Sequence, residues 1–164
     1  MNSIIEDIFI LKNKIENPDN IKIITENIEK ARFCVCAGTG RTGLVMKGFA
    51  QRLAQLKFNA FDILDSNLPM VSNKDILIAA SFRGENPIVL DYIDIAIKNK
   101  VNTIYITENP QHLSNVTYIN FNLNKEIVNK YLFASIFEIA LWIFLDCVVN
   151  ELGKGKIPTH TNLL

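Results

Sequence analysis

The chain carries no net charge and little of what marks the more specialised classes of protein. Its 164 residues include 17 basic and 17 acidic side chains but only two histidines and three cysteines. No cluster of five or more basic residues occurs, so nothing suggests a nucleic-acid-binding surface. No pair of cysteines or histidines has the spacing of metal ligands, so we expect no metal site.

The scarce cysteines indicate a reducing compartment. Cys34 and Cys36 alternate along one apolar run, a separation that is poor for a disulfide, and Cys147 lies in another apolar run. An odd number of cysteines in such surroundings is typical of core residues. We therefore expect a cytoplasmic protein.

Signals for export and for membrane insertion are also missing. Residues 1–7 are acidic and lack the apolar stretch of a signal peptide. Residues 132–149 form a nearly continuous apolar run of membrane-spanning length, but Glu138 and Asp146 interrupt it. Two carboxylates at bilayer depth are costly, so we expect a buried or interface helix and no membrane partner.

Alternating helices and strands predict one α/β domain over residues 1–164. We expect N-terminal helices in residues 1–31 and a sheet with crossover helices in residues 32–123. Residues 124–152 should contain a C-terminal helix that starts near residue 127, and residues 153–164 should form a tail. Apolar runs predict strands at 33–37, 58–64, 75–80, 101–107 and 116–123. This alternation implies a three-layer fold around a five-stranded parallel sheet with right-handed crossovers.

Two short turns are the segments from which we expect function. The first, GTGRTG at 38–43, lies between a strand and a helix expected over 44–56. The second, SFRGEN at 81–86, follows the strand that ends at residue 80. Backbone N–H groups of a strand–turn–helix unit, together with the helix dipole, form an anion site. Both turns fall at the carboxyl edge of the predicted sheet, where such sheets bind ligands.

The identity of the anion is a separate question. The first turn fits the G-x-G-x-x-G pattern of dinucleotide sites, and Asp62 and Asp65 have the spacing of an acid that holds the ribose. The second turn instead offers a hydroxyl, a guanidinium, a glycine and a cap amide, which converge naturally on one phosphate. The chain is also short for a dinucleotide domain plus a substrate domain. The residues therefore favour a phosphorylated small ligand over NAD.

These segments also resemble a known family. The first turn and the helix after it resemble the glycine-turn stretch of the 6-phospho-3-hexuloisomerases, which belong to the sugar isomerase (SIS) domain superfamily. The similar residues are Gly38 to Val45, Lys47, Phe49-Ala50 and Arg52-Leu53. Further similarities are Pro69, the turn at 81–86 over the family's S-G-S-G-E-T phosphate loop, Phe137-Glu138 with Leu145-Asp146, and His160 with Asn162-Leu163. The resemblance covers nearly the whole chain.

The resemblance implies a flavodoxin-like strand order, a homo-oligomer (tetramer or dimer), and no metal or other cofactor. The implied reaction interconverts 3-hexulose 6-phosphate and fructose 6-phosphate through a cis-enediol. Such an isomerase needs a base for a carbon-bound proton and a donor for the charge on the oxygens. The alternative is a non-catalytic module that binds a sugar phosphate, because the second turn departs from the family. NAD-dependent redox chemistry is a third, weaker interpretation.

The departures concern the residues expected to hold phosphate. Ser81 matches the family's first phosphate serine, whereas Phe82 replaces a glycine, Arg83 the second serine and Asn86 the threonine. Arg83 would contact phosphate, fill the site, or be a solvated loop charge. Asn86 is expected to cap the next helix, and the amide of a capping residue can contact a ligand as well. Thr42 is expected either to contact ligand or to cap its own helix. The predicted substrate-binding residues are Gly38, Thr39, Arg41, Thr42, Ser81, Arg83, Gly84, Glu85 and Asn86.

Glu138 and His160 are the predicted catalytic residues. Glu138 is expected to be the base, since burial in an apolar helix disfavours the charged carboxylate and raises its pKa. The alternative is a structural ion pair of Glu138 with Arg41 or Arg52. Arg41 itself either binds ligand or pairs with an acid at a subunit interface. His160 either reaches an active site or is a solvated tail residue.

Overall fold

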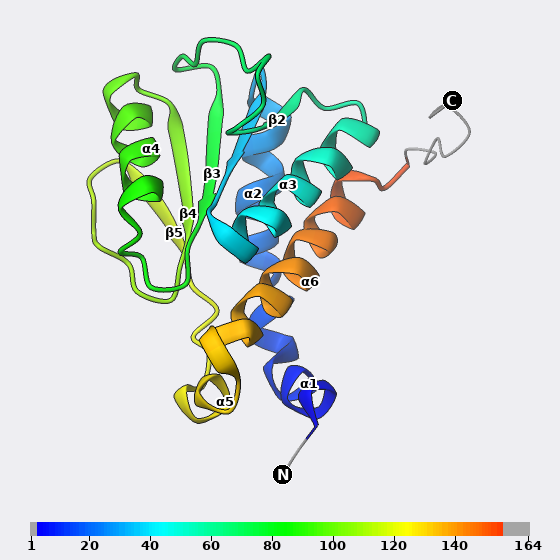
Figure 1. Ribbon diagram of the computed structural model, residues 1–164. Helices are drawn as coiled ribbons and strands as arrows, with labels where there is room; N and C mark the ends of the chain where they lie inside the picture. Colours follow the sequence, from blue (N-terminus) through cyan, green and yellow to red (C-terminus); the bar gives the residue numbers. More distant parts are fainter. Residues whose placement is uncertain (1–2, 156–164) are drawn as a thin grey trace.

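A computed structural model describes residues 3–155 as a parallel sheet with helices on both faces (Figure 1). The strands are β1 Cys34–Ala37, β2 Ala60–Asp62, β3 Ile76–Ala80, β4 Asn102–Ile106 and β5 Val116–Ile119. They form a five-stranded sheet in the order β2-β1-β3-β4-β5, and all neighbours pair in parallel. The predicted three-layer, flavodoxin-like fold is confirmed. The two edge strands, β2 and β5, are shorter than the sequence suggests.

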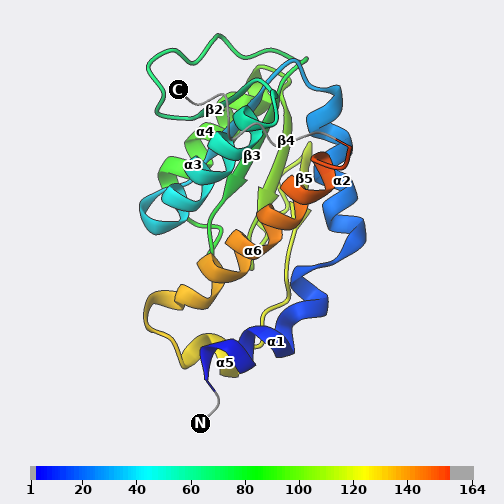
Figure 2. The same cartoon turned by 90° about the vertical axis from the view of Figure 1, so that its right-hand side faces the viewer.

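The helices divide unequally between the two faces. They are α1 Ile4–Ile15, α2 Pro18–Lys30, α3 Gly40–Gln55, α4 Pro87–Lys98, α5 Lys125–Asn129 and α6 Ser135–Leu152. Figure 1 shows α4 on one face and α2, α3 and α6 on the other. Figure 2 shows α6 lying across this second face, with α1 and α5 together at one end of the molecule. The faces bury two separate apolar clusters, of which the larger lies under α2, α3 and α6.

Two helices begin in the same way because both have Asn-Pro at their start. The side chain of Asn17 accepts the backbone N–H groups of Asp19 and Asn20 at the start of α2. Asn86 does the same at α4. Proline follows each cap, where its fixed φ suits the first helical position and its missing N–H is no loss. The predicted helix starts are confirmed.

The apolar run near the C-terminus is a helix of the core. By length and composition, Leu132–Leu152 is long and apolar enough to cross a membrane. In this fold, α6 packs against α1, α2 and α3 and buries a stripe of apolar side chains that includes Phe137, Leu141 and Phe144. A core helix of a globular domain accounts for the same composition.

The single helix predicted from about residue 127 to 152 is wrong. The segment is divided into α5, a short 3₁₀ turn at Leu132–Ala134, and α6, because Phe133 and Ala134 both have positive φ. Lys130 and Tyr131 lie just before this break. Lys130 Nζ and the Tyr131 hydroxyl donate hydrogen bonds to the wholly buried carboxylate of Asp7 in α1. The Tyr131 bond, helped by Lys130 and opposed by burial, holds the pKa of Asp7 below its ordinary value. The break therefore lies beside a contact between distant parts of the chain.

A second ion pair with a buried carboxylate joins the starts of the neighbouring strands β1 and β3. Arg32, just before β1, donates from Nε to Asp75 Oδ1 at 2.8 Å and from a terminal nitrogen to Asp75 Oδ2 at 2.7 Å. Asp75 comes just before β3, the neighbour of β1 in the sheet. Burial raises the pKa of Asp75, but Arg32 and Ser72 outweigh it and hold the pKa below its ordinary value. This end of β1 and β3 lies opposite the two turns.

Candidate active site

The first turn connects β1 to α3 and leaves three backbone N–H groups without an acceptor among the described residues. Thr39 stands at the N-cap position with an extended backbone, and its side chain makes no cap hydrogen bond. Within residues 3–155, no protein acceptor receives the backbone N–H groups of Gly40, Arg41 or Thr42. Such donors at the start of a 16-residue helix attract an anion. The expected helix start at residue 44 is wrong: α3 begins at Gly40, so Thr42 lies inside the helix and is not its cap.

Close packing fixes the first turn against its own strand. A Cβ atom on Gly43 would lie 2.9 Å from the carbonyl oxygen of Gly38, too close for any side chain. Gly40 has a φ of +56° and open space around it. The turn therefore needs glycine at 43 for close approach and at 40 for its left-handed backbone.

The second turn is held from behind by the residues that follow β4. The carbonyl of Phe82 accepts the Glu108 N–H at 3.1 Å and the Thr107 hydroxyl at 3.2 Å. The side-chain amide of Asn109 donates to the carbonyl of Arg83 at 3.2 Å. Gly84 has a φ of +69°, and a Cβ there would lie 2.2 Å from the Asn109 carbonyl oxygen. This turn is rigid, and only glycine fits at position 84.

One side chain joins the two turns. Asn86 caps α4 with its carbonyl oxygen, and its amide nitrogen donates to Thr39 Oγ1 at 2.8 Å. The two contacts use different atoms of one amide, so the expected capping role is confirmed and a second bond is added. Within the described residues, the backbone N–H groups of Arg83 and Glu85 have no acceptor. Free donors from both turns thus occur beside a direct contact between those turns.

Glu138 lies next to the first turn and pairs with Arg41. It belongs to the first turn of α6, and its side chain is 15% exposed. Arg41 Nε lies 3.1 Å from Glu138 Oε2, although the N–H is not aligned for a hydrogen bond with that buried oxygen. Arg52, the other expected partner, donates to Gln55 instead. The acid that pairs with Arg41 thus comes from its own chain. A hollow of about 330 Å³ opens beside Arg41 and Glu138.

Phe82 and Arg83, which differ from the family pattern in the second turn, have different surroundings. The ring of Phe82 packs on that of Phe137, with 5.5 Å between centroids, so it fixes the turn to the start of α6. Arg83 is exposed and lines a separate hollow of about 490 Å³ with Glu108 and Lys125. Arg83 makes no ion pair in the part of the chain described.

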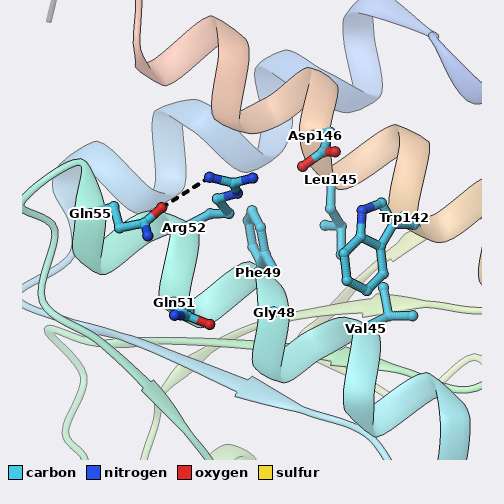
Figure 3. A pocket seen from close by; sticks show the side chains of 9 residues that line it. All are labelled: Val45, Gly48, Phe49, Gln51, Arg52, Gln55, Trp142, Leu145 and Asp146. Carbon is cyan, nitrogen blue, oxygen red and sulfur yellow. Dashed lines mark hydrogen bonds between the residues drawn. The ribbon is translucent and has the colours of Figure 1, made fainter. Parts of the chain in front are cut away.

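A third hollow of about 280 Å³ lies between α3 and α6 (Figure 3). It holds none of the predicted site residues. Trp142 covers Gly48 there, and a Cβ at position 48 would lie 3.1 Å from the indole ring. Arg52 and Asp146 face this hollow from the two helices. Trp142 also lines the hollow beside Glu138, so it forms a wall between the two.

The remaining predictions concern the acids after β2, the tail and metals. Asp62 accepts the N–H of Leu64, and Asp65 accepts that of Asp62, so both carboxylates are bound within their own loop. His160 lies outside the described residues. Within residues 3–155 no group of three or more His, Cys, Asp or Glu side chains is placed to hold a metal ion.

The residues that support the second turn carry little signal of this role in the sequence. Thr107, Glu108 and Asn109 act on a turn about 25 residues earlier, and no local motif marks them. The Glu108 carboxylate also accepts the N–H groups of Phe121 and Leu123; burial raises its pKa and those two bonds oppose the rise. The only available signal was a cluster of polar side chains directly after an apolar strand.

Known proteins share this chain's sequence pattern and fold. No family model matches the chain. The 3-hexulose-6-phosphate isomerase of Methanocaldococcus jannaschii is 29% identical over 162 residues, which cover 93% of this chain and 86% of that protein. The crystal structure of a Methanococcus jannaschii protein, from which a 3-hexulose-6-phosphate isomerase function was inferred, has a TM-score of 0.80 at 27% identity and covers 93% of this chain and 88% of the other.

A more distant structure shares the fold. An Escherichia coli CFT073 protein in complex with a phosphosugar has a TM-score of 0.76 at 19% identity, over 95% of this chain and 88% of that one. The relatives at 27% and 29% identity support a sugar-phosphate isomerase, and the more distant structure supports the fold alone. The chain therefore has the sugar isomerase (SIS) domain fold, and it resembles the 3-hexulose-6-phosphate isomerases along most of its length.

Proposed function

We propose that the chain isomerises a sugar phosphate, interconverting 3-hexulose 6-phosphate and fructose 6-phosphate through a cis-enediol. The observation that carries this proposal is the contact between the two turns, which brings free backbone donors near the Arg41–Glu138 pair. A phosphate bound at the turns would anchor the sugar and place its reacting carbon. The isomerase named among the relatives supports the same chemistry.

In this proposal the residues divide the work between anchoring and proton transfer. Glu138 is the base that removes the proton from carbon 3 of fructose 6-phosphate and returns it to carbon 2. The guanidinium of Arg41, already beside that carboxylate, balances charge that develops on the enediol oxygens. Phosphate contacts come from Ser81, the donors of both turns and the Thr39 hydroxyl. His160 supplies a further acid–base group, and neither a metal nor another cofactor takes part.

The proposed assembly is a homo-oligomer in the cytoplasm. Helices α1, α3 and α6 and the 3₁₀ turn before α6 expose large apolar side chains, which include Ile5, Phe9, Leu44, Leu132, Phe133 and Trp142. Burial of such side chains between copies would stabilise a dimer or tetramer. Three free cysteines, two of them buried, agree with a reducing compartment.

Proton NMR of fructose 6-phosphate in heavy water tests the reaction. Deuterium entering at carbon 3 in the presence of the protein shows a 2,3-enediol and supports the isomerase. Glu138→Gln, which keeps the shape of the side chain, is expected to stop the exchange while sugar-phosphate binding remains. Binding without exchange by the unaltered protein would contradict the catalytic proposal.

The second candidate function is a non-catalytic sugar-phosphate-binding module. It is favoured by Phe82, whose ring occupies the side of the turn that faces α6, and by Arg83, which lines a separate hollow. Restoring the family pattern with Phe82→Gly and Arg83→Ser separates the two functions. Exchange that appears only in this double variant supports the module, whereas exchange already present in the unaltered protein supports the isomerase.

A further inference from the structure

Tyr105 has a buried hydroxyl that the packing of its ring does not explain. It lies within β4, its side chain is wholly buried, and its ring sits in the cluster under α4 with Val35, Ala79 and Ile93. Its hydroxyl oxygen has no hydrogen-bond partner among the described residues. Phenylalanine would fill the same volume and leave no buried polar group unsatisfied.

The register of the sheet brings this hydroxyl to the second turn. Tyr105 pairs with Ala79 of β3, and side chains alternate along a strand, so Ser81 follows Ala79 on the same side. The backbone continues in register past β3, since the Ser81 N–H donates to the Ile106 carbonyl, so the Ser81 side chain is the next one on the side of Tyr105. Burial raises the pKa of Tyr105, so the phenol keeps its proton at neutral pH and can donate it.

We propose that Tyr105 is a positioning residue for Ser81: its buried hydroxyl donates to Ser81 Oγ and directs the serine proton outward to the phosphate of the ligand. A serine hydroxyl rotates freely and has one proton to donate. A donor fixed behind the oxygen occupies a lone pair and leaves that proton for the phosphate, which has only acceptors. This inference rests on the proposed function, because it takes a sugar phosphate as the ligand of the second turn.

Ligand affinity measured by calorimetry on the full chain tests this role. Tyr105→Phe is expected to raise the Kd for fructose 6-phosphate about fivefold, the size expected for one neutral hydrogen bond. The variant keeps the ring, so its melting temperature is expected to equal or exceed that of the unaltered protein. Ser81→Ala raises the Kd as well. Tyr105→Phe in the Ser81→Ala background adds nothing further, because the phenol acts only through the serine.

Tyr118→Phe is the matched control. Its ring lies on the same face, 6.0 Å from that of Tyr105, but its hydroxyl accepts the N–H of Leu113, away from the turn. The Kd is expected to stay unchanged. An unchanged Kd in Tyr105→Phe, or additive effects in the double variant, would overturn the positioning role alone. No binding of fructose 6-phosphate by the unaltered protein would overturn the proposed function and this inference with it.

Discussion

The two turns end neighbouring strands of one sheet, yet they are held in different ways. The first turn, at 38–43, is open: its helix starts without a side-chain cap, and the N–H groups of Gly40, Arg41 and Thr42 have no acceptor within residues 3–155. The second turn, at 81–86, is tied from behind by Thr107, Glu108 and Asn109 and from the side by the Phe82–Phe137 contact. The same sheet edge thus presents one open binding element and one that is braced by its neighbours.

This difference suggests how the fold tolerates an altered phosphate loop. The backbone carbonyl groups of Phe82 and Arg83 accept the bonds from Thr107, Glu108 and Asn109, so these bonds do not depend on which side chains stand at positions 82 and 83. The first turn depends instead on glycine at positions 38 and 43 for close approach. Side-chain substitutions at positions 82 and 83 should therefore affect mainly ligand binding, whereas substitutions at positions 38 and 43 should affect mainly folding.

The largest effect is expected on catalysis, from a change at Glu138, which pairs with Arg41 of the first turn. Glu138→Gln is predicted to lower the rate of deuterium exchange into fructose 6-phosphate by about 100-fold or more, because a general base is lost. Proton NMR in heavy water measures the rate. The control is Glu151→Gln, near the exposed end of the same helix, which should exchange at the original rate. Equal rates in both variants would show that Glu138 is only the ion-pair partner of Arg41.

The next largest effect compares one glycine from each turn. Gly84→Ala is predicted to destabilise the protein by about 3 kcal/mol, because its Cβ would meet the Asn109 carbonyl in addition to the strained φ. Gly40→Ala has the same backbone strain and open space, so about 1 kcal/mol is expected. Urea unfolding of both variants measures the difference. Losses of equal size would mean that the second turn is not rigid.

The bond between the turns is tested with the two Asn-Pro helix starts. Asn86→Ala should cost about 2 kcal/mol, about half from the lost cap and half from the lost bond to Thr39. Asn17→Ala removes a cap of the same geometry that makes no further side-chain bond, so about 1 kcal/mol is expected. Thermal unfolding gives both values. Fructose 6-phosphate affinity should fall only in Asn86→Ala; a similar fall in Asn17→Ala would contradict a specific link between the turns.

The smallest effect is expected from the Arg32–Asp75 ion pair, at the end of β1 and β3 that lies opposite the two turns. The pKa of Asp75 is lower in the folded chain than its ordinary value of 3.8. The Arg32–Asp75 pair therefore stabilises the fold above about pH 4, and this contribution is lost as the pH falls through the lower, folded-state pKa. Asp75→Asn keeps an acceptor for Arg32, so it should cost only about 1 kcal/mol at pH 7. It should also flatten the pH dependence of the melting temperature on the acid side, as the pH falls below the ordinary pKa of 3.8.

This last variant separates stability from the site. Its affinity for fructose 6-phosphate should equal that of the unaltered protein, because the pair lies at the far end of β1 and β3 from both turns. A melting temperature with the original acid dependence would show that other carboxylates, such as Asp7, dominate the acid side.

The sequence predicts most of the architecture because its signals are local. Apolar runs, Asn-Pro caps and two glycine-containing turns each depend on neighbouring residues, and the parallel sheet follows from their alternation. The break within 127–152 could not be predicted in this way. It lies next to Lys130 and Tyr131, whose partner Asp7 is more than 120 residues away in the sequence. The apolar pattern of the segment alone favours one continuous helix.

For the site, the sequence was enough to predict which residues reach the carboxyl edge of the sheet, since parallel strands end on the same side. It also limited the partners of Glu138 to two arginines. The folded chain pairs Glu138 with Arg41 and not with Arg52, joins Asn86 to Thr39 and aligns Tyr105 with Ala79, two residues before Ser81. These contacts depend on the register of strands and the packing of helices distant in sequence, and such long-range geometry leaves no periodic trace in the chain.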